Sequence, residues 1–131
     1  IAKAADRARN ARQPEMPEKL LFKSVNTKLF LEADDIAGFK ADGNYANLIS
    51  FDGEYLVLEN LLSLERRLKG WGHFVRVDRS TMINIVKVRS IDQQQHSCTL
   101  KSNDGRKLEI PLSISGISAL SDALESIRTS S

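Results

Sequence analysis

The chain has 131 residues, 41% of them hydrophobic and 27% charged, with a formal net charge of +2. A chain of this size supports a single domain that folds without a disulfide or a metal, and the composition is that of an ordinary globular protein. Because the sequence has no run of about 18 apolar residues, we expect no membrane span and no lipid contact. The small positive charge permits nucleic-acid binding but does not indicate it.

Few residues suit redox or metal chemistry. Cys98 is the only cysteine, so it cannot form an internal disulfide, and its strand-like surroundings predict a half-buried core residue rather than a reactive thiol. The two histidines, His73 and His96, have no cysteine partner close by, so we expect no structural zinc and no cofactor. A cytoplasmic compartment fits this cysteine usage best.

Residues 1–18 differ in composition from the rest of the chain. Residues 1–12 are rich in alanine and arginine and favour a helix, which Pro14 and Pro17 would end. We predict a linker or the end of a connecting helix from an upstream domain, with a basic arm as the alternative. The chain begins at Ile1, with no methionine and no signal-peptide pattern, which favours a piece of a longer protein.

Short strand-like runs begin at Lys19. Asp34 and Asp35 precede the third run and are predicted to form a turn and a cap. The dipeptide Asp52-Gly53 is the strongest hairpin signal, because both positions of a two-residue turn must tolerate positive φ. The runs occupy residues 20–25, 28–31, 36–41, 45–51 and 54–58, with turns at 26–27, 42–44 and 52–53.

One interior helix follows. Asn60 can cap it, leucines line one face of Leu61–Leu68, and Gly70 ends it. Trp71 and Phe74 are then available to pack against the core. Strands are predicted at residues 74–77, 86–92, 97–101 and 107–111, with a turn at 103–105 and a final amphipathic helix over about 115–127. This pattern indicates a mostly-β domain with antiparallel pairing rather than βαβ units.

The sequence lacks the signatures of common enzymes. It has no glycine-rich phosphate loop and no Gly-x-Ser-x-Gly elbow. Asp34 and Asp35 are adjacent, so a strand would point them to opposite faces, where they make a poor catalytic pair. We therefore do not expect an enzyme.

The stretch from Phe74 to Asn84 carries the most functional information. A strand-like run enters Asp78-Arg79-Ser80, and an apolar pair and Asn84 follow. A loop at the end of a strand presents side chains to a partner more freely than a ladder does. Arginine there offers a fork of donors that suits a guanine edge or a phosphate. From the pattern alone, this is a surface turn with a solvated arginine.

From about Leu20 to Ser126, however, the chain resembles a LytTR-type (LytR/AlgR family) DNA-binding domain of bacterial transcription regulators. The resemblance rests on a series of motifs in the family's order rather than on any one of them. The matching features are Asp35-Ile36, Gly43-Asn44-Tyr45, the leucine helix Leu61–Leu68, Phe74-x-Arg76-Val77-x-Arg79-Ser80 with Asn84, Ile91, the turn at Gly105, and Ile110-Pro111-Leu112-Ser113.

The resemblance implies an elongated antiparallel β-sheet fold with one short interior helix and a C-terminal helix. It places a DNA-binding domain over residues 19–127, with a short tail at 128–131. It also implies that loops enter successive major grooves and that the DNA bends. Two copies, possibly as a homodimer on DNA, would occupy direct repeats in a promoter. The domain would be the output of a response regulator or similar protein, with a sensor or receiver domain upstream.

Carried over residue by residue, the resemblance predicts three contact regions. In the first, residues 42–47, the family's base-contacting position falls on Ala46, which could touch a thymine methyl group. The ring of Tyr45 could instead pack at the base of the loop. The residues nearest that position are Asn44, Tyr45, Ala46 and Asn47.

The second contact falls on Arg79, with Ser80 beside it for a phosphate oxygen. A salt bridge between Arg79 and Asp78 is the competing interpretation, and Arg76 is expected to be structural. The third region is residues 112–115, where Ser113 matches the family's serine. Candidate phosphate contacts, each equally consistent with a solvated surface charge, are Lys40, Lys87, Arg89, Lys101, Arg106 and Lys107.

Two residues depart from the family pattern. Asp78 stands where the family often has histidine, and Ile114 where it often has arginine. Both departures remove a potential cation from the DNA side, and Asp78 adds a negative charge beside Arg79. They motivate an alternative function, a protein-interaction domain that keeps the fold but reads DNA weakly or not at all.

Overall fold

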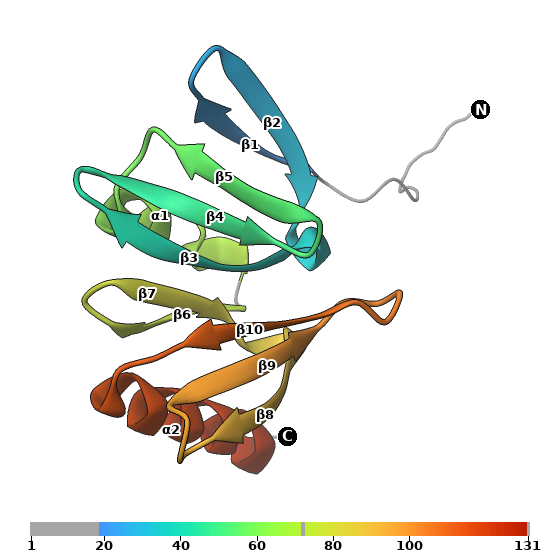
Figure 1. Ribbon diagram of the computed structural model, residues 1–131, viewed down its shortest axis with the longest axis vertical. Coiled ribbons are helices and arrows are strands. Elements are labelled where there is room, and N and C mark those ends of the chain that lie inside the picture. The colour runs from blue at the N-terminus through green and yellow to red at the C-terminus, as the bar shows by residue number, and fades with distance from the viewer. Residues whose placement is uncertain (1–18, 72, 131) are drawn as a thin grey trace.

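Two β layers lie one above the other in the computed structural model, which describes residues 19–71 and 73–130 (Figure 1). The predicted linker over residues 1–18 lies outside the described residues. A hairpin of two strands and a five-stranded sheet form one half, and a three-stranded sheet with the C-terminal helix forms the other. All strand pairs are antiparallel. The predicted mostly-β fold with two helices is therefore confirmed.

The elements follow in chain order. The first half contains β1 (Lys19–Ser24), β2 (Thr27–Glu32), β3 (Ile36–Asp42), β4 (Tyr45–Ser50), β5 (Gly53–Val57), α1 (Leu61–Arg67), β6 (Phe74–Asp78) and β7 (Thr81–Asn84). The second half contains β8 (Val88–Asp92), β9 (Ser97–Lys101), β10 (Lys107–Pro111) and α2 (Ile114–Ser130). The sheet orders are β1-β2, β5-β4-β3-β7-β6 and β10-β9-β8.

The five-stranded sheet is buried on both faces at its centre. Neighbouring residues on a strand point to opposite faces, and in β7 Met82 joins one core while Ile83 joins the other. The first core fills the space between this sheet, the β1–β2 hairpin and α1, and includes Phe22, Phe39 and Leu64. The second lies between the sheet and the other half, and includes Leu100, Ile110 and Leu120.

The interior helix forms as its sequence predicts. The Oδ1 atom of Asn60 accepts a hydrogen bond from the backbone N–H of Ser63 at 2.9 Å, and this satisfies one of the free donors at the helix start. The leucine face is buried in the first core. Trp71 and Phe74 pack against the same core, as predicted.

Three details differ from the predictions. The β4–β5 turn consists of Phe51 and Asp52, because Ser50 pairs with Gly53, and of the two residues of the predicted turn only Gly53 has positive φ (+155°). The predicted strand over 86–92 begins with a 3₁₀ turn at Ile85–Lys87. The last helix continues to Ser130, beyond the end of its apolar stripe.

Buried polar groups tie the sheet together. The side-chain amide of Asn84 donates to the carbonyl oxygens of Ile36 at 2.8 Å and Ala33 at 3.2 Å, so Asn84 ties β7 to the start of β3. Asp35 accepts a hydrogen bond from the backbone N–H of Glu32 at 3.1 Å, so its predicted capping role is confirmed as well. Cys98 is buried, and burial raises the pKa of its thiol to about 11, so it is a core residue.

Candidate nucleic-acid interface

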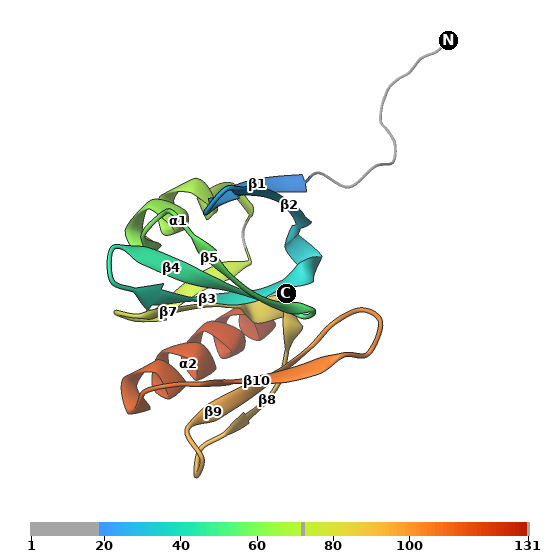
Figure 2. The same cartoon turned by 45° about the horizontal axis from the view of Figure 1, so that its top comes forward.

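The three predicted contact regions lie on one side of the molecule. They are the β3–β4 loop (42–47), the β6–β7 turn (78–80) and the segment leading into α2 (112–115), and we call this side the loop face. Figures 1 and 2 both show the β3–β4 loop, the β6–β7 turn and the start of α2 at the same edge. The backbone N–H of Ala41 donates to the carbonyl oxygen of Ser80 at 2.8 Å, which joins the first two loops directly.

Arg76 shapes the β6–β7 turn. Its guanidinium donates to the carbonyl oxygens of Arg79 at 2.7 Å and Asp78 at 3.2 Å, and it pairs with Glu65 on α1 at 3.2 Å. Arginine has a planar fork of donors that can serve several acceptors at once. The structural role predicted for Arg76 is thus confirmed.

Arg79 occupies the tip of this turn with its side chain exposed. Within residues 19–71 and 73–130, no carboxylate lies close enough to Arg79 to form an ion pair. The competing interpretation, a salt bridge to Asp78, is therefore absent from the described structure. Its guanidinium remains available to a partner.

Asp78 is instead occupied by hydroxyl and amide donors. Its Oδ1 accepts from the backbone N–H of Ser80 at 2.9 Å and from the Ser80 hydroxyl at 3.3 Å. Its Oδ2 accepts from the hydroxyl of Ser113 at 2.7 Å, across a separation of 35 residues in sequence. Partial burial raises the pKa of Asp78, but the hydrogen bonds from Ser113 and Ser80 outweigh it, so the net pKa lies below the ordinary value.

Ser113 stands at the start of α2 and connects to it. Besides donating to Asp78, its Oγ accepts a hydrogen bond from the backbone N–H of Gly116 at 3.0 Å, as an N-cap does. Two further bonds hold the segment before it: Leu112 N–H donates to the carbonyl of His96 at 2.8 Å, and Lys40 Nζ donates to the carbonyl of Pro111 at 2.9 Å.

The first loop requires one correction. Ala46 is 0% exposed and belongs to the first core, so its methyl group cannot touch a thymine methyl without opening that core. Pairing of Ala46 with Ala41 and Val57 places its side chain on the inner face of β4. Asn44 is exposed, Tyr45 is 45% exposed and Asn47 is half-buried, so these three remain candidates.

Several predicted phosphate contacts have other roles or positions. Lys40 is bonded to Pro111, as described above. Lys87 is only 7% exposed and bonds to the side-chain oxygen of Asn103 at 2.7 Å, with Asp34 at 3.4 Å, so it is a buried structural cation. Arg89 is exposed on β8.

The remaining predicted cations lie in residues 101–107, which we call the far hairpin because β9 and β10 turn there on the side opposite the loop face (Figures 1 and 2). Arg106 pairs with Asp104, with Nε and Oδ1 3.0 Å apart. The structure therefore does not bring this group together with the three loops. The cations concerned are Lys101, Arg106 and Lys107.

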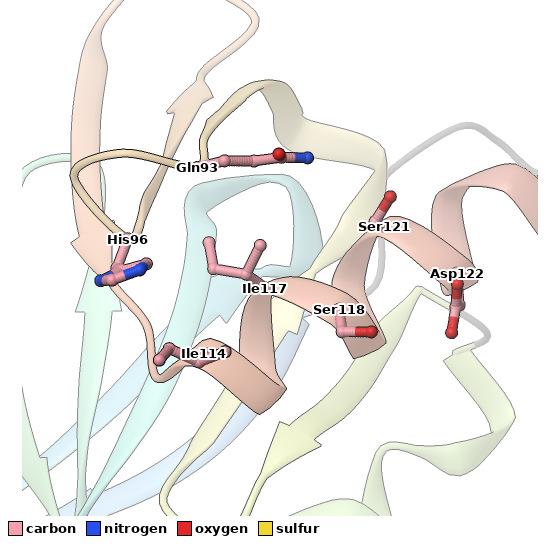
Figure 3. A pocket seen from close by; sticks show the side chains of 7 residues that line it. All are labelled: Gln93, His96, Ile114, Ile117, Ser118, Ser121 and Asp122. Atoms are coloured by element: carbon pink, nitrogen blue, oxygen red, sulfur yellow. The ribbon is translucent and has the colours of Figure 1, made fainter.

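A surface hollow of about 360 Å³, which the sequence did not predict, lies beside the third loop. Figure 3 shows His96 and Gln93 from the β8–β9 turn on one side and side chains of α2 on the other. Ile114, at the start of α2, is 73% exposed at this hollow. His96 has φ of +55°, a conformation in which its carbonyl accepts the bond from Leu112.

The described residues contain neither a metal-binding cluster nor a helix suited to a membrane. No group of three or more histidine, cysteine, aspartate or glutamate side chains there could hold a metal ion. None of the helices in that part of the chain has the length and apolar character needed to cross a bilayer.

Comparisons with known proteins agree with this geometry. The model of the LytTr DNA-binding domain family matches residues 26–125. Two heme-containing CO-sensing transcriptional regulators of Paraburkholderia xenovorans (strain LB400), RcoM 1 and RcoM 2, are 28% identical over 99 residues and 27% identical over 96 residues. These alignments cover 76% and 73% of this chain but only 37% and 36% of the relatives, so the chain spans little more than a third of their length.

A solved LytTr DNA-binding domain of a methyl-accepting/DNA response regulator from Bacillus cereus has the same fold. The TM-score is 0.54, with 84% of this chain and 96% of that domain covered at 13% identity. A similarity at this identity supports the fold alone. The family match covers most of the chain, and it includes both the β6–β7 turn and the start of α2. The chain belongs to the LytTR family of DNA-binding domains, which bind DNA in transcription regulators.

Proposed function

We propose that this domain recognises specific double-stranded DNA sequences through the loop face, as the output part of a longer transcription regulator. The observation that carries the proposal is Arg79, which is exposed at the tip of the β6–β7 turn and has no ion pair within the described residues, while Arg76 fixes the backbone of that turn. An arginine fork is the commonest specific partner of a guanine edge in the major groove. Ser80 in the same turn and Asn44 in the β3–β4 loop are exposed and supply further hydrogen-bonding groups.

The finer geometry follows from the loops' arrangement. Three loops at one edge can contact a duplex at more than one place, so we propose that they enter successive major grooves. Two copies would then bind direct repeats about one helical turn apart, each repeat facing the same side of the duplex. An upstream sensor or receiver domain would control this binding; both RcoM relatives are CO-sensing regulators much longer than this chain.

The test is a selection followed by affinity measurements. The 131-residue chain is used to enrich sequences from a pool of randomised duplexes, and fluorescence anisotropy then gives Kd for the enriched duplex and for random duplex. Specific binding should be tighter by about a thousandfold or more. It should also weaken steeply between about 50 and 200 mM salt. A chain that enriches no sequence would contradict the proposal.

The second candidate, a protein-interaction domain, draws on Ile114. An apolar side chain that is 73% exposed beside a hollow suits a protein partner better than a phosphate backbone. The salt series separates the two candidates, because association through apolar contacts lacks the steep dependence of counterion release. Weak DNA binding that does not change with salt would favour the protein partner.

A further inference from the structure

We propose that Asp78 is a positioning residue, a role that rests on the proposed function. Its hydrogen bond with Ser113, which we call the lock, holds the second and third loops together as one DNA-contacting unit. The carboxylate belongs to the β6–β7 turn, and its Oδ2 atom accepts the hydroxyl proton of Ser113 at 2.7 Å. The two loops belong to different sheets and are 35 residues apart in the chain, and the bond adds to the packing of α2 against β6 in the second core.

The bond makes the two loops interdependent. Ser113 Oγ also accepts from the N–H of Gly116, so one hydroxyl connects the β6–β7 turn to the first turn of α2. The other carboxylate oxygen of Asp78 accepts from Ser80, which fixes the turn that carries Arg79. Moving α2 would therefore move the Arg79 turn, and the spacing of the two loops sets the spacing of the contacts they make.

Gly116 provides an independent sign that this contact is built closely. A Cβ atom at position 116 would lie 2.9 Å from Oδ2 of Asp78 and 3.1 Å from Oγ of Ser113. Any side chain there would push apart the two groups that form the bond. The glycine thus permits α2 to approach the β6–β7 turn closely enough for the Asp78–Ser113 contact.

The same contact keeps Asp78 from pairing with Arg79. A carboxylate beside an arginine would ordinarily form an ion pair with it. Here three hydrogen bonds from serine groups hold the carboxylate, and Arg79 has no ion pair within the described residues. Asp78 therefore supplies a negatively charged acceptor for the lock without neutralising the arginine.

The test compares Asp78→Ala, Ser113→Ala and the double variant, each assayed with the enriched duplex and with random duplex. Each single change should weaken binding of the enriched duplex about 3- to 10-fold, and the double variant should lose no more than the worse single variant, because both remove the same bond. Binding of random duplex should weaken less than binding of the enriched duplex in Ser113→Ala, and it should be tighter in Asp78→Ala, which removes a negative charge near the phosphates.

Two controls separate a positioning role from damage to the fold. Ser113→Thr restores a hydroxyl at the cap and should recover most of the affinity that Ser113→Ala loses. Ser102→Ala removes the matching serine–aspartate bond, to Asp104, in the far hairpin and should leave both affinities unchanged. In the free protein, hydrogen exchange of the Gly116 amide should speed up in Asp78→Ala and Ser113→Ala, which reports on the lock without DNA.

Any one of the following results would overturn the role of Asp78. They are unchanged affinity for the enriched duplex, a parallel loss for both duplexes together with a lower Tm, or losses that multiply in the double variant. Tighter binding of the enriched duplex by Asp78→Ala would likewise show that Asp78 acts only as a repelling charge. If the wild-type chain enriched no sequence, the proposed function itself would fail, whereas the Gly116 exchange would still show whether the lock exists.

Discussion

The β6–β7 turn and the far hairpin contain the same pair of residue types but use them in opposite ways. In the far hairpin, Asp104 pairs with Arg106 at 3.0 Å, so the two charges offset each other. In the β6–β7 turn, Asp78 takes its hydrogen bonds from serines, and Arg79 is left without an ion pair among the described residues. Asp104 also accepts a hydrogen bond from Ser102, through the same Oδ1 atom that faces Arg106, whereas both carboxylate oxygens of Asp78 accept hydrogen bonds from serines.

The largest expected difference between the two sites comes from removing each arginine. Arg79→Ala should cost about 1–3 kcal/mol of DNA-binding free energy, roughly a 5- to 150-fold rise in Kd for the enriched duplex, if Arg79 contacts a base. Arg106→Ala is the matched control and should change Kd less than about twofold, because it lies away from the loop face. Equal losses in the two variants, measured by anisotropy, would erase the distinction.

A smaller effect is expected when the lock is opened without touching its charges. Gly116→Ala adds a methyl group 2.9 Å from Asp78 Oδ2, so we expect Kd for the enriched duplex to rise about 3- to 10-fold. Alanine favours the helix by about 1 kcal/mol over glycine, and this gain offsets the cost of the close contact with Asp78. Thermal stability should therefore change little. A normal Kd for Gly116→Ala would mean that the two loops do not need this close approach.

Freeing the paired arginine should have a still smaller effect. Asp104→Ala removes the carboxylate that offsets Arg106. If the far hairpin stays away from the duplex, Kd should change by less than about twofold at low salt. A clear gain in affinity, with a steeper salt dependence, would place the far hairpin in contact with DNA after all.

Both carboxylates should titrate below their ordinary pKa, with little consequence near neutral pH. Hydrogen bonding from Ser102 and Arg106 lowers the pKa of Asp104 to about 2, and the pKa of Asp78 is lowered as well. The pKa of both groups in the unfolded chain is 3.8, and the pKa in the folded protein is lower. Ionisation of each carboxylate therefore stabilises the fold fully above pH 3.8, and this stabilisation is lost as the pH falls through the pKa of the folded protein. NMR titration of the carboxyl carbons should show both transitions below pH 3.8.

Ser113→Ala is expected to raise the pKa of Asp78 and to leave the pKa of Asp104 unchanged, because only Asp78 loses a hydrogen-bond donor. If the Asp78 transition did not move, the 2.7 Å bond would not form in solution.

Much of the fold could be predicted because its signals are local. Asn60 as a cap, the leucine face of α1 and the turn at Gly43 (φ +62°) depend on a few consecutive residues. The sequence also indicated the structural role of Arg76, although it could not name Glu65 or the two carbonyl groups that Arg76 binds.

The rest of the site depends on contacts between distant segments. Ala46 lies on a strand that is buried in a sheet with two covered faces, and its position in the loop motif did not reveal which face it occupies. Lys40 bonds to Pro111 across 71 residues and Ser113 to Asp78 across 35. Charge alone could not tell which lysines and arginines share a side, so the sequence did not indicate that Lys101, Arg106 and Lys107 lie opposite the loop face.

The most direct test maps the DNA-contacting surface. Backbone amide shifts of the isotope-labelled 131-residue chain would be compared with and without the enriched duplex. The account predicts that the largest changes fall at residues 42–47, 78–80 and 112–116, with residues 102–106 nearly unaffected. Changes centred on the far hairpin, with the loop face unperturbed, would contradict it.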